Sequence, residues 1–244
     1  MPIFRVTSAE VHLTFTAARD KNQLARDIAR GDFQILRDGR QIEDIVSFSP
    51  YNDGALSTLV MVDVSDSMLP GLSLERAASQ WLQSNSDAAR DRVSFLDFGN
   101  DVQPDNKLPI SKRHLTSLYD ALMEVLPKFA RLTSGRRSLI LMTDGIDNYS
   151  LHSLYEVIAM AQRYDIAVYA VTAHPDKKQF YRADVLELLC NETGGRYFEV
   201  RKTDAMIAAV SQITQELRNG YDVVFRPDSA TAGMHEVSIH PTQR

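Results

Sequence analysis

The sequence predicts an α/β fold: a doubly wound, mostly parallel sheet with helices on both faces, and a small antiparallel β-unit formed by both termini. Strand-like and helix-like segments alternate through the middle of the chain. The central strand-like segments are continuous apolar runs, as expected for strands that are covered on both faces. Short segments near both ends instead alternate between apolar and polar residues, which is typical of antiparallel strands.

The central segments define the predicted sheet and its helices. Strands are predicted at 56–64, 92–99, 137–145, 166–173 and 196–200, with a further strand at 102–110 that two prolines restrict to an edge or an irregular form. Helices are predicted at 73–86, 115–132, 150–165, 183–193 and 202–220. Such sheets bind their ligands at the carboxyl ends of the strands, so a functional site is expected at that edge.

The end segments predict the β-unit. Residues 32–48 contain two strand-like runs around Asp38-Gly39, a strong hairpin signal. Further short strands are expected at 11–17, 221–227 and 235–241. We therefore expect an N-terminal β segment over 1–50, an α/β domain over 54–220, and C-terminal strands over 221–244 that pack with the first segment.

Composition narrows the class of protein. The chain has 244 residues, of which 44% are apolar and 24% are charged, and this is ordinary for a globular protein. A formal charge of -5 and the lack of a Lys/Arg run do not favour a nucleic-acid partner. Apolar runs are too short for insertion into a membrane. The single cysteine, Cys190, lies in an apolar helical run and is expected to be a buried small hydrophobe. Oligomeric state stays open.

Oxygen-bearing side chains cluster after two predicted strands and before one helix. Asp63 lies at the end of the strand at 56–64, Ser65 and Ser67 lie in the loop that leaves it, and Asp144 comes after LILM at the end of another strand. Thr116 stands at the start of the helix at 115–132. Because all three loops should meet at one edge of the sheet, we expect these side chains to converge. The alternative for Thr116 is a role only as the N-cap of its helix.

The ordered motifs DVSDSM, TSLYDAL and TDGID resemble the metal-ion-dependent adhesion site (MIDAS) of von Willebrand factor A (VWA) domains. The resemblance spans roughly residues 56–220 and implies a VWA or Rossmann-like fold. It also implies one divalent cation, Mg²⁺ or alternatively Mn²⁺ or Ca²⁺. The implied metal residues are Asp63, Ser65, Ser67, Thr116 and Asp144. The sequence departs from the family pattern at Asp66 and Leu115, where the family often has glycine.

The flanks, GDFQILRDGRQIEDIVSF and LRNGYDVVFRP, resemble a bacterial subfamily of these domains that is common in acidobacteria. Members of that subfamily are typically exported, which implies a periplasmic, cell-surface or secreted protein. The first residues, MPIFRVTSAE, contain no apolar region of a signal peptide, so a cytoplasmic location stays open on the sequence alone.

The chemistry of the motif favours binding over catalysis. Mg²⁺ prefers six oxygen ligands and keeps water readily. Neutral hydroxyl groups from serine and threonine hold the cation without cancelling its charge, so it can still accept a carboxylate. We therefore expect a non-enzymatic module that binds an Asp or Glu side chain of a partner protein. The six histidines show no zinc spacing such as HExxH.

Two alternatives remain. A magnesium-dependent aspartyl phosphatase or phospho-receiver would need a second acidic residue in the first loop, which Asp66 could supply, and a lysine at a later strand end. The only lysines in that region, Lys177 and Lys178, follow well after the strand at 166–173. The other alternative is a structural domain with a vestigial metal site, which five intact motif residues argue against.

Overall fold

The computed structural model describes residues 10–20, 23–51, 54–99, 102–104, 116–173, 181–227 and 235–242. The chain forms two compact units. One unit contains Gly54–Gln215, and the other combines Met1–Asp53 with Glu216–Arg244.

A six-stranded sheet is the centre of the first unit, in the order β12-β11-β10-β7-β8-β9. All pairings are parallel except that of β9 with β8, which is antiparallel, as expected for the proline-containing edge strand. Every residue of the central strand β7 is buried, which explains its continuous apolar sequence. The strands are β7 (Leu56–Asp63), β8 (Arg92–Phe98), β9 (Val102–Pro104), β10 (Arg136–Met142), β11 (Ile166–Ala173) and β12 (Tyr197–Val200).

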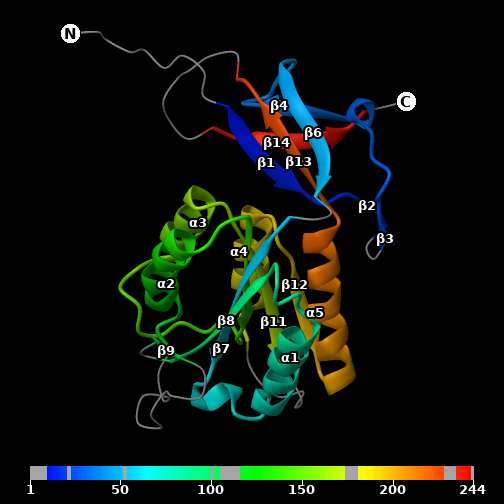
Figure 1. The fold of residues 1–244 in the computed structure, drawn as a ribbon. Helices are drawn as coiled ribbons and strands as arrows, with labels where there is room; N and C mark the ends of the chain where they lie inside the picture. The colour runs from blue at the N-terminus through cyan, green and yellow to red at the C-terminus, as the bar shows by residue number, and fades with distance from the viewer. Residues whose placement is uncertain are drawn as a thin grey trace, which may run out of the picture. The chain divides into compact units, whose positions relative to one another are not determined.

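Helices cover both faces of this sheet (Figure 1). One apolar core joins α2, α3 and α4 to β7, β10 and β11. The helices α1 and α5 lie on the opposite face (Figure 1). This arrangement confirms the predicted doubly wound α/β class. The helices are α1 (Leu72–Asn85), α2 (Leu118–Leu132), α3 (Leu154–Arg163), α4 (Ala183–Thr193) and α5 (Thr203–Arg218).

Strand order places the functional edge between β7 and β10. From β7 the chain builds outward through β8 and β9, whereas from β10 it builds in the other direction through β11 and β12. A crevice forms at such a reversal, outside the carboxyl ends of the two strands, because the crossover connections leave in opposite directions. The loops that follow Asp63 and Met142 therefore start side by side at this edge of the sheet.

The second unit is an antiparallel β structure, which confirms the predicted terminal β-unit. Its sheets have the orders β1-β13-β6 and β14-β4-β5, with a two-stranded β2-β3 pair. Asp38 and Gly39 both have positive φ, 51° and 76°, which is the type I′ geometry expected of an Asp-Gly hairpin between β4 and β5. The strands are β1 (Val11–Phe15), β2 (Ala18–Asp20), β3 (Gln23–Leu24), β4 (Phe33–Arg37), β5 (Arg40–Gln41), β6 (Ile45–Tyr51), β13 (Gly220–Phe225) and β14 (Val237–Pro241).

Aromatic packing stabilises this β-unit. The rings of Phe15, Phe33, Phe48 and Tyr221 pack against one another at centroid distances of 4.9 to 6.3 Å. The Tyr221 hydroxyl donates to the carbonyl of Ala25 at 2.9 Å and accepts the N–H of Ile28 at 3.0 Å, so its polar atom is satisfied inside the core.

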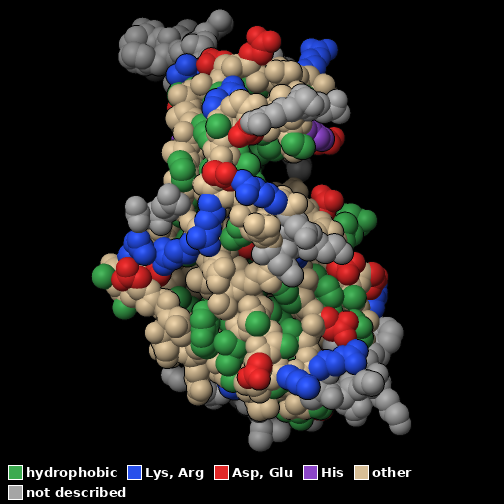
Figure 2. Space-filling view, turned by 90° about the vertical axis from the view of Figure 1, so that its right-hand side faces the viewer, with side chains coloured by type: hydrophobic (Ala, Val, Ile, Leu, Met, Phe, Trp, Pro, Cys, Tyr) green, Lys and Arg blue, Asp and Glu red, His purple; other side chains and the backbone are tan. Residues whose placement is uncertain are grey.

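The distribution of charged side chains, the position of Cys190 and the character of the helices agree with what the amino-acid composition predicts. Basic and acidic side chains are interspersed on the face that Figure 2 presents. Cys190 is fully buried, and burial raises the pKa of its thiol to about 12, so it is an inert core residue as expected. Among the helices in the described ranges, none combines the length and apolarity that crossing a bilayer requires.

Close packing fixes the start of α1 against the sheet. Gly71 precedes the helix in a right-handed conformation, φ -90° and ψ -14°, that any residue can adopt. A Cβ atom there would lie 2.9 Å from Ala173 Cβ and 3.0 Å from the Ala173 carbonyl oxygen, at the carboxyl end of β11. The missing side chain therefore allows α1 to approach the functional edge.

We predict that Gly71→Ala destabilises the α/β unit by about 1–3 kcal/mol, the usual cost of overpacking a close contact. Because the backbone conformation suits alanine, the loss would come from the contact with Ala173 alone. Gly31→Ala is the control, since a Cβ at Gly31 meets nothing within 4 Å. Urea denaturation of both variants measures the difference, and equal stability would contradict this account of the packing.

Candidate metal centre

Asp63 ends the central strand β7, at the edge of the sheet where the strand order reverses. In the strand register, Val62 of β7 pairs with Met142 of β10, so the residues that follow, Asp63 and Thr143, are neighbours. The Thr143 hydroxyl donates to Asp63 Oδ2 at 2.6 Å, and the Ser65 N–H donates to Asp63 Oδ1 at 2.9 Å. These bonds hold the carboxyl group in one orientation at the end of the strand.

Burial makes the charge on Asp63 costly. Its side chain is fully buried, and its pKa is raised to about 7, chiefly by desolvation and also by nearby Asp144, against the opposing hydrogen bonds from Thr143 and Ser65. A cation beside these two carboxyl groups would favour their charged forms. The pair is therefore a good acceptor for a divalent ion.

The loop after β7 carries the two serine hydroxyl groups. Ser65 Oγ and Ser67 Oγ are 3.2 Å apart and share a hydrogen bond. Ser65 is buried, whereas Ser67 and Asp66 are exposed. The fully buried Met68 anchors the loop, and its N–H donates to the Ser65 carbonyl at 3.0 Å. The Ser65 hydroxyl therefore lies on the buried side, near Asp63, and the Ser67 hydroxyl lies on the solvent side.

Thr116 and Asp144 are joined through the loop that follows β10. The Thr116 N–H donates to Asn148 Oδ1 and its carbonyl accepts the Asn148 N–H, both at 3.2 Å. Asp144 is fully buried, and its Oδ1 accepts the Ile146 N–H at 3.0 Å. The N-cap residue of α2 is Ser117, so the interpretation of Thr116 as that cap is wrong.

All five predicted residues therefore lie at one edge of the sheet. Hydrogen bonds connect Ser65 and Ser67 to Asp63, and others connect Thr116 to the loop of Asp144. Within the described ranges, no three His, Cys, Asp or Glu side chains are grouped closely enough to hold a metal by themselves. A metal here would depend on hydroxyl oxygens and water, which is the donor set that suits Mg²⁺.

A clamped loop forms the rim of this site. The Ser150 hydroxyl donates to Asp147 Oδ1 at 2.5 Å. Asp120 in the first turn of α2 accepts the N–H groups of Leu151 at 3.1 Å and His152 at 3.0 Å. These contacts give Asp120 and Asp147 structural roles, and they fix residues 146–153 beside the Thr116 backbone.

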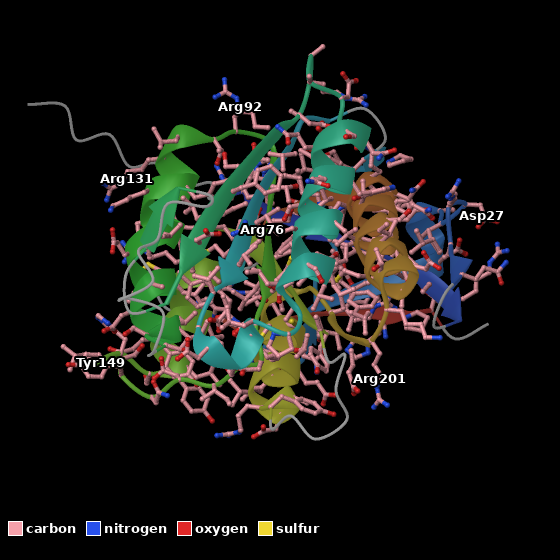
Figure 3. The ribbon with its side chains drawn as sticks, turned by 90° about the horizontal axis from the view of Figure 1, so that it is seen from below. Asp27, Arg76, Arg92, Arg131, Tyr149 and Arg201 are labelled. Carbon is pink, nitrogen blue, oxygen red and sulfur yellow. The ribbon has the colours of Figure 1, made fainter. Side chains whose placement is uncertain are left out.

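The same rim presents apolar side chains. Leu151 is 95% exposed and Tyr149 is 63% exposed. Figure 3, which views this end of the unit, shows Tyr149 projecting outward at its edge. A hollow of about 510 Å³ lies between this loop and α2, and its lining includes Ser117 and Ala121.

Sequence reasoning did not assign functions to Thr143, Asn148 or Glu75. Thr143 and Asn148 form long-range hydrogen bonds that motif spacing does not reveal. Glu75 did leave a signal, because it stands four residues after Gly71 and seven before Leu82, on the face of α1 that the sheet covers. Lys177 and Lys178, which the phosphatase alternative involves, lie outside the described residues.

Comparisons with known proteins add information about the fold. No family model matches the chain, and no curated protein matches it in sequence. Proximal thread matrix protein 1 from the mussel byssus, solved with zinc in its MIDAS motif, has a TM-score of 0.56 and 11% identity over 73% of this chain. The fold is VWA-like.

Two further structures are similar. Another structure of the mussel protein has a TM-score of 0.50 and 12% identity over 80% of this chain. The PilB minor pilin from Streptococcus sanguinis, solved as a point mutant, has a TM-score of 0.50 and 12% identity over 68% of this chain and 62% of its own. The present chain spans about half of the mussel protein, 49% and 51% in the two structures.

We predict that the metal-free protein loses stability as pH rises from about 5 to about 7. The folded pKa of Asp63, about 7, lies above its ordinary value of 3.8, so the unfolded state releases this proton first. Stability therefore falls with rising pH through this window and levels off above the folded pKa. Thermal unfolding in EDTA at several pH values measures the effect.

Asp63→Asn is the control for this pH dependence. Asparagine has nearly the same shape and does not titrate, so the fall between about pH 5 and about pH 7 should be smaller in this variant. An identical pH profile for the wild type and Asp63→Asn would show that Asp63 is not the group responsible.

Proposed function

We propose that the α/β unit is a non-enzymatic module that holds one divalent cation, Mg²⁺ in the first instance, and uses it to bind an acidic side chain of a partner protein. The cation residues are Asp63, Ser65, Ser67, Thr116 and Asp144. The single observation that carries the proposal is a hydroxyl pair that connects the buried Asp63 carboxyl group to solvent. The zinc-occupied MIDAS motif of the mussel protein supports a divalent ion at a site of this type.

Each group would make a different contribution to holding the cation. Asp63 and Asp144 are buried and would supply negative charge, directly or through water. Ser65, Ser67 and Thr116 would supply neutral oxygens. The bound cation would act as a Lewis acid that accepts a carboxylate. Because the exposed Ser67 lies at the solvent side, a partner carboxylate would approach there.

The buried setting of Asp63 favours binding over phosphoryl transfer. Its two carboxylate oxygens already accept the Thr143 hydroxyl and the Ser65 N–H, and the side chain has no exposed surface. A nucleophilic aspartate needs an oxygen that the substrate can reach. We also propose that the protein is exported from the cytoplasm, as the resemblance of the sequences on both sides of the α/β unit implies.

We predict that the wild-type protein binds Mg²⁺ and Mn²⁺ and that Asp63→Ala abolishes this binding in isothermal titration. The physical reason is the loss of the central buried carboxyl group. Asp66→Ala is the matched control, because Asp66 lies in the same loop but is exposed and is not a proposed ligand. Its metal affinity should stay within a few-fold of the wild type. A wild-type protein that binds neither ion at millimolar concentration would refute the proposed function.

The partner is expected to require the metal. Pull-down from the native organism in Mg²⁺ and in EDTA, with Asp63→Ala in parallel, identifies proteins that depend on the site. Conversion of the acidic side chains of a captured partner to amides should then prevent its binding. Capture that persists in EDTA would exclude metal-mediated recognition.

We predict that Leu151→Ser weakens partner binding about tenfold, ~1.4 kcal/mol, because this apolar side chain stands on the rim of the site. Leu132→Ser is the matched control: Leu132 is 76% exposed but ends α2 just before β10 begins, at the opposite edge of the sheet. Mg²⁺ affinity should be unchanged in both variants. Equal partner affinity for the two variants would show that the loop of Leu151 does not contact the partner.

A further inference from the structure

Glu75 is a buried acid that the five-residue site does not use. It lies in the first turn of α1, and its side chain has no exposed surface. Neither of its carboxyl oxygens has a hydrogen-bond partner among the residues that the structure describes. Buried carboxyl groups are normally paired, so this one requires an explanation.

Helix geometry places Glu75 on the side of α1 that faces the sheet. Residues four apart lie on one face of a helix, so Glu75 shares the face of Gly71, which contacts Ala173 at the carboxyl end of β11. Ala78 and Leu82 continue the same buried stripe. Viewed from the functional edge, α1 lies beside the strands of the sheet, with Arg76 extending toward β8 (Figure 3).

The charges that surround Glu75 are unbalanced. Burial raises its pKa well above the ordinary value, Asp63, Asp144 and Asp97 act in the same direction, and Arg76 lowers it. Arg76 Nη2 donates to both carboxylate oxygens of Asp97 at 2.9 Å. That cation is therefore shared with Asp97 and does not by itself balance a negative charge on Glu75.

A packing role does not account for this side chain. A methionine or leucine would fill a similar volume without the cost of removing a carboxyl group from water. The electrostatic neighbours of Glu75 include both carboxyl groups of the proposed metal site, Asp63 and Asp144. The group is too far from them to form a three-acid metal cluster, since the described residues contain none.

We propose that Glu75 is a further carboxylate of the metal centre, facing the cation from α1 and accepting a hydrogen bond from a metal-bound water molecule. This inference rests on the proposed function. It makes Glu75 a positioning residue, because it acts on the cation through water. Groups in that position fix metal-bound ligands and strengthen metal binding in other proteins.

The test is Glu75→Gln, measured with Mg²⁺ and with Mn²⁺ alone. Glutamine keeps the length and shape of a neutral glutamic acid but cannot carry the charge. We expect metal affinity in isothermal titration to fall about 10–100-fold, the usual effect of losing such a group. The thermal midpoint in EDTA should be equal to or above that of the wild type, because no partner within the protein is lost.

Glu187→Gln is the matched control. It makes the same change of charge on α4, where the side chain is exposed, and should leave metal affinity unchanged. Glu75→Met is the second variant, in case glutamine prevents folding: an apolar residue of similar length suits the buried position. It should also bind the metal more weakly.

The outcomes separate this inference from the proposed function. Unchanged affinity in Glu75→Gln, with binding lost in Asp63→Ala, overturns the role of Glu75 and leaves the metal site intact. A lower midpoint in EDTA with unchanged metal affinity also overturns it, because that is the signature of a packing role. Lack of metal binding by the wild type refutes the proposed function itself.

Discussion

Asp63 places a carboxyl group at the buried end of the central strand, and the arrangement of the α/β unit follows from the need to stabilise it. Its side chain has no exposed surface, and its pKa of about 7 reflects the cost of that burial. Thr143 from the neighbouring strand and the Ser65 backbone each donate one hydrogen bond to it. Two loops from different strands are therefore held together by one acid, which explains why the site forms where the strand order reverses.

The loops farther from Asp63 are fixed by hydrogen bonds within the protein, so the rim of the site is ordered independently of the cation. Asp120 at the start of α2 accepts two N–H groups from the loop after β10, and Asn148 makes reciprocal bonds with Thr116. A preorganised rim lowers the conformational cost of binding a partner. The exposed Leu151 and Tyr149 are carried on this fixed segment and add apolar contact surface.

Much of the fold could be predicted because each strand carries its own signal. The apolar run at 56–64 and the Asp38-Gly39 turn depend on local sequence, and both predictions are confirmed. The structure describes only part of the strand predicted at 102–110. In that part, Val102–Pro104 forms β9, an antiparallel strand at the edge of the six-stranded sheet. Convergence of the three loops also followed from topology. The bonds from Thr143 to Asp63 and from Asn148 to Thr116 could not be predicted, because they depend on strand register and loop conformation.

Glu75 links the question of metal affinity to that of partner binding. Charge on the inner side of a cation holds it more tightly but leaves less positive potential for an outer ligand. If Glu75 is ionised beside Asp63 and Asp144, three carboxylates face a divalent ion, and a partner carboxylate meets a weaker field. Removal of the Glu75 charge should therefore loosen the metal and, at saturating Mg²⁺, tighten the acidic partner. A packing role for Glu75 would produce neither change. Weaker metal binding together with tighter partner binding would therefore identify an electrostatic role for Glu75.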